Sequence, residues 1–296
     1  MFRKSLAIFI FMVFAGSLAA APETAPLESK LTAAEVADRN VTARGGLQAW
    51  RAVQTMSYTG KMAAGGNRRA TLPLPTPDRR SSQQMPSIRP VNEVQLPFLM
   101  DLKRGGKMRI ELQFNGQTAI QVFDGANGWK LRPFLNRRVV EPYTPQEAKM
   151  ASMKADLDGP LVDYAAKGNK VDLVGMEKVD DRDTYRLKVT LNNGSAMDVW
   201  IDAQTFLETK MGGQPRRFDG VYHPVEVFFR DYHIVNGLVI PFVLETKVLP
   251  VAQIGQKYMA PPIPVEKTII EKVVVNPNLE ESRFSKPDVG SASNVN

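Results

Sequence analysis

Apolar and polar residues alternate along 108–131, a segment that Asn- and Gly-containing turns divide into three parts. Every second residue of 108–114 is apolar, and Ile120 and Val122 lie two positions apart in the part that follows. Successive side chains of a β-strand point to opposite faces of a sheet, so a period of two predicts strands with one apolar face each. The segment therefore predicts a β-hairpin and, after a tight turn at 124–128, a third strand.

The loop of this hairpin decides which residues share a face. A three-residue loop at 115–117 would pair Leu112 with Ile120 and Ile110 with Val122, so that the apolar faces of the two strands coincide. A two-residue turn within the same loop would place these apolar sets on opposite faces. Because exposure of one apolar set would be unfavourable, we predict the three-residue loop.

A second hairpin repeats the pattern over 183–202. Leu187 and Val189 alternate with polar residues, and Val199 and Ile201 do so in the returning strand. A three-residue loop at 193–195 would pair Val189 with Val199 and Leu187 with Ile201. Two hairpins with one apolar face each predict a large antiparallel sheet, and that apolar face must be covered by helices or by a ligand.

Further strands are predicted where β-branched and aromatic residues lie between turn residues. The predicted ranges are 54–62, 94–103, 171–178, 207–212, 225–235, 238–248 and 265–275.

Two capping boxes of the form Thr-x-x-Glu, at 32–35 and 144–147, predict the starts of two helices. The first helix is expected to run to about residue 44 and the second to about residue 156. Shorter helical pieces are expected at 47–53 and 161–167.

The chain has 296 residues, of which 43% are hydrophobic, enough to bury a sizeable core. We expect a single domain over 31–287, because one β-rich domain of this length is common. An insertion at 63–92 holds five prolines and five arginines. It is either a mobile connection between two strands or a basic lid that touches a membrane. The polar tail at 288–296 is expected to be disordered.

The N-terminus has the pattern of an export signal. Arg3 and Lys4 precede an apolar run that ends near Phe14, and small residues follow. This pattern predicts a signal peptide over 1–19 and a mobile leader at 20–30. The run is shorter than the roughly 17–25 residues needed to span a bilayer, which favours cleavage over an uncleaved anchor. Export of a chain of this size without cysteine favours a bacterial periplasm.

Composition also limits the chemistry. Without cysteine there is no thiol nucleophile, no zinc–cysteine site and no lipidated cysteine. The two histidines, His223 and His233, are expected to be ordinary surface or core residues, and no common catalytic motif is present. The net charge of +7 would suggest nucleic acid in a cytosolic protein, but export favours anionic lipids or acidic polymers instead. We therefore expect a binding protein without a cofactor or metal, and not an enzyme.

Several Gly-, Pro- and aromatic-containing motifs follow one another in an order that resembles a known family. They are Arg44-Gly45-Gly46-Leu47, Asp124-Gly125 through Trp129, Asp158-Gly159-Pro160-Leu161 through Tyr164, Val174-Gly175 through Tyr185-Arg186-Leu187, Ile201-Asp202 before Leu207, Gly237-Leu238-Val239-Ile240-Pro241, and Val275-Asn276-Pro277 through Phe284. Most of the chain is covered. It resembles the outer membrane lipoprotein-sorting, or LolA/LolB-like, periplasmic superfamily, and within it an uncharacterised branch. The insertion at 63–92 departs from the family pattern.

This resemblance implies an α+β fold: a strongly curved antiparallel sheet that forms an unclosed β-barrel, with helices covering its concave face. It also implies an apolar cavity for acyl chains between the sheet and the helices. We expect this ligand-binding cavity to be lined by Ile110, Leu112, Ile120, Val122, Met150, Met153, Leu187, Val189, Val199 and Ile201. Each of these residues could instead be ordinary core. The helix that begins at 145 is the expected movable cover.

The predicted function is that of a periplasmic carrier, which binds lipid acyl chains or lipidated protein and delivers them toward the outer membrane. Its expected partners are the acyl chains and a donor or acceptor protein of the inner or outer membrane, and the carrier itself is expected to be a monomer. The alternative is a lipid- or lipoprotein-sensing regulatory module, because the same half-barrel resembles the sensing part of RseB-like regulators. A regulator should have a second domain, and none is evident, which favours the carrier.

Overall fold

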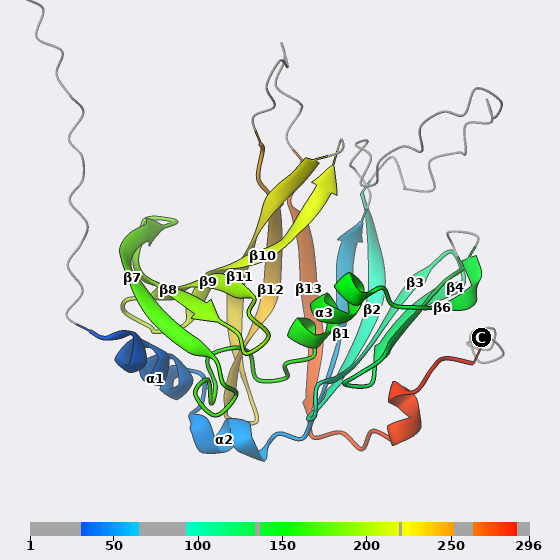
Figure 1. The fold of residues 1–296 in the computed structure, drawn as a ribbon, viewed down its shortest axis with the longest axis horizontal. Helices are drawn as coiled ribbons and strands as arrows, with labels where there is room; N and C mark the ends of the chain where they lie inside the picture. The colour runs from blue at the N-terminus through cyan, green and yellow to red at the C-terminus, as the bar shows by residue number, and fades with distance from the viewer. Residues whose placement is uncertain (1–30, 65–92, 134–136, 219–220, 252–262, 289–296) are drawn as a thin grey trace, which may run out of the picture.

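One curved sheet organises the structure, and α3 lies within its curve (Figure 1). The computed structural model describes residues 31–64, 93–133, 137–218, 221–251 and 263–288. The predicted signal peptide at 1–19, the leader at 20–30, most of the insertion at 63–92, and the tail from 289 onward lie outside the described residues.

The first six strands are β1 (Thr55–Ala64), β2 (Val94–Lys103), β3 (Lys107–Phe114), β4 (Gln117–Phe123), β5 (Gly128–Arg132) and β6 (Arg137–Pro142). The remaining strands are β7 (Lys170–Val179), β8 (Arg182–Thr190), β9 (Ala196–Asp202), β10 (Glu208–Phe218), β11 (Val221–Val235), β12 (Leu238–Val248) and β13 (Glu266–Val275). The observed bounds of β2 and β12 coincide with the predicted ranges.

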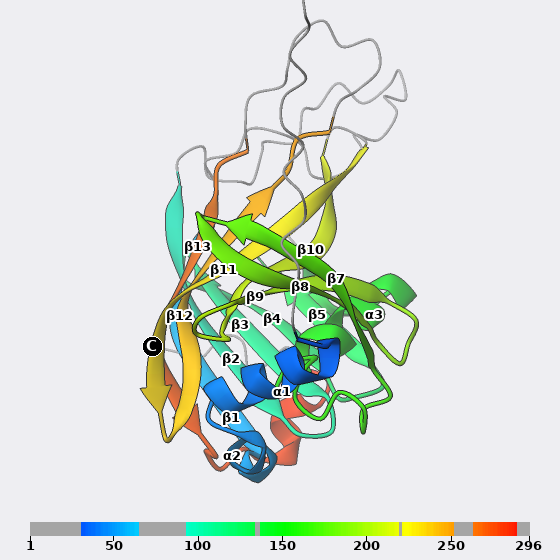
Figure 2. The same ribbon diagram turned by 90° about the vertical axis from the view of Figure 1, so that its left-hand side faces the viewer.

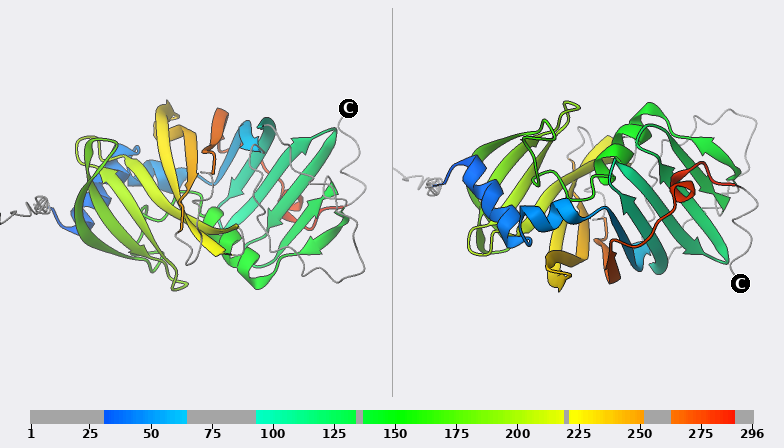
Figure 3. Two further views of the ribbon diagram at one scale, coloured as in Figure 1. Left: turned by 90° about the horizontal axis from the view of Figure 1, so that it is seen from above. Right: turned by 90° about the horizontal axis from the view of Figure 1, so that it is seen from below.

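All thirteen strands belong to one sheet in the order β6-β5-β4-β3-β2-β1-β13-β12-β11-β10-β9-β8-β7. Strands that follow one another in the chain pair with each other, except β6 and β7, which form the two free edges of the sheet. In addition, the first strand, β1, pairs with the last, β13. Figures 2 and 3 show that the sheet bends strongly without joining these edges. The predicted fold class, an α+β unclosed barrel, is confirmed.

The α-helices are α1 (Ala33–Ala43), α2 (Leu47–Ala52) and α3 (Pro145–Lys154), and a 3-10 helix, η2 (Glu281–Phe284), follows the last strand. Both predicted capping boxes form. The predicted helical piece at 161–167 is wrong, because this stretch consists of turns. Asp163 there has a φ of 52°, a left-handed conformation that interrupts a right-handed helix.

The register of the first hairpin also differs from the prediction. Leu112 pairs with Ala119 and not with Ile120, because a two-residue turn replaces the three-residue loop. Asn115 and Gly116 have φ values of 49° and 70°, the positive values that a two-residue type I′ turn requires and that Asn-Gly adopts readily. A one-residue change of register turns every side chain of the returning strand to the other face of the sheet.

The apolar residues that this register turns outward are buried there. Ile120 and Val122 are 3% and 0% exposed, although they face away from the concave side. The chain after β13, residues 276–288, crosses the outer face of the sheet (Figure 3), and Phe284 packs against Ile120, Val122 and Leu131. We call residues 276–288 the C-terminal segment. The predicted register failed because it assumed one buried face, whereas this part of the sheet has two.

The second hairpin has the predicted loop length in a shifted position. Leu187 pairs with Val199 and Val189 with Met197, so the register differs from the predicted one by two residues. The loop is 192–194, and its last residue is glycine in the left-handed conformation, which suits a three-residue hairpin loop. A two-residue shift keeps each side chain on its predicted face.

Candidate functional site

The helix α3 lies against the concave face of the sheet (Figure 1). Its first turn is fixed locally: the Thr144 hydroxyl accepts the Glu147 N–H at 3.3 Å, and the Glu147 carboxylate accepts the Thr144 N–H at 2.8 Å. Pro145 at the first helical position is already restricted to a helical φ. Ala151 is buried in the main core of the sheet, and its small side chain lets the helix approach closely.

Two contacts with β5 hold the N-terminal end of α3. Lys130 donates to both carboxylate oxygens of Glu147, at 2.5 and 2.6 Å. The Tyr143 ring lies directly over Gly128, where an added Cβ would be only 1.8 Å from the ring. The Tyr143 N–H also donates to the Gly128 carbonyl at 2.8 Å. Glycine at 128 is therefore a steric requirement for the position of the helix.

The chain that follows α3 is held by Asp158, which is 2% exposed. Arg104 donates to its carboxylate at 2.9 Å, Lys167 donates to its other oxygen, and Arg44 donates to its carbonyl at 2.9 Å. Burial opposes ionisation of Asp158, but the hydrogen bonds from Lys167 and Arg104 keep its pKa below the ordinary value. The helix that we expected to be a movable cover is thus anchored at both ends.

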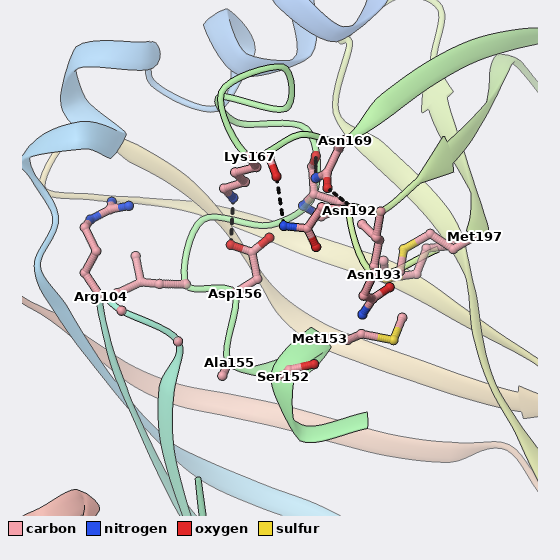
Figure 4. Close-up of a pocket in the computed structure, with 16 residues that line it drawn as sticks. Arg104, Ser152, Met153, Ala155, Asp156, Lys167, Asn169, Asn192, Asn193 and Met197 are labelled. Carbon is pink, nitrogen blue, oxygen red and sulfur yellow. Dashed lines mark hydrogen bonds and ion pairs between the residues drawn. The ribbon is translucent and has the colours of Figure 1, made fainter. Parts of the chain in front are cut away.

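A hollow of about 350 Å³ opens between the C-terminal end of α3 and the sheet (Figure 4). We call it the methionine hollow. Its larger apolar lining residues are Met153, Leu157, Leu191, Met197 and Met211, and its polar ones include Arg104, Asp156, Lys167, Asn169, Asn192 and Asn193. Figure 4 shows Met153 and Met197, with Asn193 beside them, on one side of the hollow, and Arg104 and Lys167 toward the other. The lining is therefore amphipathic, with an apolar part and a charged part.

Asp156 gives the charged part a group that titrates near neutral pH. Lys167 pairs with it at 2.6 Å. Burial raises the pKa of Asp156 to about 6 against the opposing effect of Lys167, and the neighbouring Asp158 adds to the rise. The charge at this end of the methionine hollow consequently changes between mildly acidic and neutral pH.

A second hollow, of about 120 Å³, lies along a different face of α3, between that helix and strands β3 to β5. We call it the cationic hollow. Its lining residues are Met108, Gln121, Lys130, Arg132, Tyr143, Glu147, Met150, Ala151 and Lys154.

The ten residues predicted to line the cavity do not share one site in the structure. Met153 lines the methionine hollow and Met150 the cationic hollow. Leu187, Val189, Val199 and Ile201 are at most 1% exposed and pack beneath α1 and Leu161. Ile110 and Leu112 are partly buried beside the main core, and Ile120 and Val122 lie on the outer face under Phe284. None of these last eight lines either hollow.

Sequence reasoning missed most of the lining. Met197 and Met211 lie in strands that were predicted, and Met197 shares the face of Val199, so alternation could have identified it. Arg104, Lys167 and Asn192 belong to turns between elements. No periodic pattern marks such residues, because only the curvature of the sheet brings their turns together.

The histidines do not form a common site. His233 is half-exposed and pairs with Asp231 at 3.0 Å, whereas His223 is buried and contacts the Leu249 carbonyl. Among the described residues, no group of three His, Cys, Asp or Glu side chains is arranged to hold a metal ion. In the same part of the chain, the helices are too short or too polar to cross a bilayer.

Comparison with known proteins gives matches at the level of fold. No family model matches the sequence, and no curated protein matches it. A LolA superfamily protein from Nitrosomonas europaea is 14% identical, and the alignment covers 86% of this chain and 98% of that one with a TM-score of 0.50.

Two further solved structures give slightly lower scores. A DUF1329 family protein from Desulfovibrio piger is 14% identical over 86% of this chain and 97% of that one, with a TM-score of 0.49. A candidate outer membrane lipoprotein-sorting protein domain from Vibrio parahaemolyticus is 12% identical over 86% and 96%, with a TM-score of 0.48. The fold is thus similar to that of a LolA superfamily protein, and the predicted resemblance is confirmed at this level.

Proposed function

We propose that this protein is a periplasmic carrier that binds the acyl chain of a lipid or a lipidated protein and passes it toward the outer membrane without chemical change. The observation that supports this proposal is the methionine hollow between α3 and the concave face of the sheet. The carrier acts as a monomer that exchanges its cargo with a donor and an acceptor protein at the membranes.

The size and lining of the methionine hollow suit part of an acyl chain. Its volume of about 350 Å³ falls at the lower end of the roughly 300–1,000 Å³ that small-molecule sites occupy. Each methylene removed from water contributes about 0.8 kcal/mol. Flexible thioether side chains such as Met153, Met197 and Met211 adapt to ligands of different shape.

The charged part of the methionine hollow favours an amphiphile over a plain hydrocarbon. Arg104 and Lys167 lie there with Asp156, so a polar group at the end of an acyl chain would meet hydrogen-bonding partners. A carrier must also release its cargo. A hollow with only one apolar side binds an acyl chain less tightly than a fully apolar hollow does.

Mass spectrometry of the purified protein after organic extraction tests the proposal. We expect lipid in an amount comparable to that of the protein. Purified protein that yields no lipid, and that also fails to bind a fluorescent fatty acid added in vitro, would contradict it.

A matched pair of variants assigns the binding to the methionine hollow. Met211→Glu places a carboxylate among the lining residues, and we expect it to weaken binding of a fluorescent fatty acid at least tenfold. Met176→Glu makes the same change on β7 at a partly buried methionine that lines neither hollow, and it should leave binding unchanged. Equal effects of the two variants would place the ligand elsewhere.

The second predicted function, a lipid-sensing regulatory module, would bind similar ligands. No observation on the described residues favours it over the carrier, and it stays a prediction.

A further inference from the structure

Polar side chains line the cationic hollow because of the register of the first hairpin. Gln121 pairs with Ile110 on one side and with Lys130 on the other, so both polar residues face the concave side. The predicted register would have turned Gln121 outward and placed Val122 opposite Ile110. The two-residue turn at 115–116 therefore builds a polar site on a face that is otherwise apolar.

The lining of the cationic hollow carries three cations and one carboxylate. Lys130 is only 9% exposed and pairs with Glu147, and Arg132 donates to Glu141 at 2.6 Å through one terminal nitrogen. Lys154, on the last turn of α3, lines this hollow and makes no ion pair with the described residues. The hollow is therefore electropositive, and its unpaired charge lies on Lys154.

Two buried hydrogen-bonding atoms of this lining lack partners. Within the described part of the chain, neither Nε of Arg132 nor the hydroxyl of Tyr143 makes a hydrogen bond. Buried polar atoms are nearly always hydrogen-bonded in folded proteins, so each such exception points to a missing partner. Arg132 Nε is a donor only, and the Tyr143 hydroxyl can donate. A ligand that accepts hydrogen bonds would satisfy both.

The protonation states agree with an anionic ligand. Burial, and to a smaller extent the charge of Glu147, raises the pKa of Tyr143, so the phenol keeps its proton and remains a donor. Lys154 is an exposed residue of this lining, and partial desolvation, followed by repulsion from Arg216, lowers its pKa. A bound anion would shift this pKa back upward, since an opposite charge nearby favours the charged form of an amine.

We propose that the cationic hollow binds a phosphate group through Arg132, Tyr143 and Lys154. These donors come from β5, from the chain before α3 and from α3 itself, so they approach from several directions, as the oxygens of a tetrahedral anion require. A volume of about 120 Å³ has room for several water molecules, which suits a phosphate but not an acyl chain. The phosphate is either free or part of a lipid head group.

This site is separate from the methionine hollow and does not depend on the proposed carrier function. Three probes keep the two apart in calorimetric titrations of the whole protein. Inorganic phosphate tests the cationic hollow alone, and monomyristoylglycerol tests acyl binding alone. Myristoyl-lysophosphatidylglycerol carries both groups.

Three variants identify the site. Lys154→Gln removes the unpaired charge, and we expect it to weaken binding of phosphate-bearing probes about tenfold, the range of one charge-assisted hydrogen bond. Tyr143→Phe removes a hydroxyl that hydrogen-bonds to no described residue, and we expect about a threefold loss. The control is Lys149→Gln, which makes the same charge change on an exposed residue of α3 that lines neither hollow, and it should alter binding less than twofold. Binding of monomyristoylglycerol should be the same in all of them.

The source of the phosphate follows from which probes bind. Binding of inorganic phosphate that depends on Lys154 supports a site for the free anion. Binding of the lysophospholipid alone, with the same dependence, supports a head-group site. Failure of both phosphate-bearing probes to bind, or equal effects of Lys154→Gln and Lys149→Gln, would overturn the proposal whether or not monomyristoylglycerol binds.

Discussion

Replacing Phe284 by alanine tests whether the C-terminal segment is part of the core. Phe284 is 1% exposed and packs against Ile120, Val122 and Leu131. Truncating a fully buried phenylalanine to alanine costs about 3–5 kcal/mol, because it removes apolar contact and leaves a cavity. We expect a loss of unfolding free energy in this range, which is a large fraction of the stability of an ordinary domain.

The ion pairs of the same segment should matter much less. Glu281 pairs with Lys103 at 2.7 Å and with Lys107 at 2.5 Å, but its side chain is 64% exposed. Exposed pairs contribute little to stability, because water and salt screen them. Glu281→Gln is therefore the matched control in the same segment, and its denaturation midpoint should lie close to that of the wild type.

Urea denaturation followed by tryptophan fluorescence measures both variants. Trp129 packs beside Phe284 and its partners, so its emission reports on this part of the structure. A loss below about 1 kcal/mol for Phe284→Ala, far under the range for a buried phenylalanine, would refute the packing of the C-terminal segment on the outer face. A larger effect of Glu281→Gln than of Phe284→Ala would show that charge, and not packing, holds the segment.

Two further predictions concern α3 and its surroundings. Gly128→Ala should cost about 1–3 kcal/mol by urea denaturation, because the new methyl group would force the Tyr143 ring away from β5. Asp156 has a pKa raised from 3.8 to about 6, so the folded state holds its proton more tightly than the unfolded chain. Its contribution to stability is present below pH 3.8 and is lost as pH rises through about 6. Denaturation curves from pH 4 to 7 should show this loss in the wild type and in the exposed control Asp172→Asn, but not in Asp156→Asn. An unchanged pH dependence in Asp156→Asn would contradict this assignment.

The elements of the fold could be predicted from local patterns. Alternation located the strands, and the Thr-x-x-Glu capping boxes located α1 and α3, because these signals depend on residues close together in the chain. The register of the first hairpin could not be predicted by the same logic. Asn115-Gly116 favours the two-residue turn, but this turn exposes an apolar face unless another segment covers it. Phe284, some 160 residues later in the chain, provides that cover.

The candidate site was predictable only in part. The methionine spacing on α3 identified Met150 and Met153, although they line different hollows. The apolar residues of the second hairpin were predicted to line a cavity; in the structure they pack beneath α1 and line neither hollow. Alternation shows which residues are buried but not whether protein or ligand covers them, since both environments require the same side chains.

Photocrosslinking tests the central claim most directly. A palmitic acid that carries a diazirine on its chain is bound to the protein, irradiated and located by peptide mass spectrometry. The carrier account predicts saturable labelling of peptides that contain Met153, Met197 or Met211. Labelling confined to the outer face around Ile120, or no saturable labelling, would contradict it.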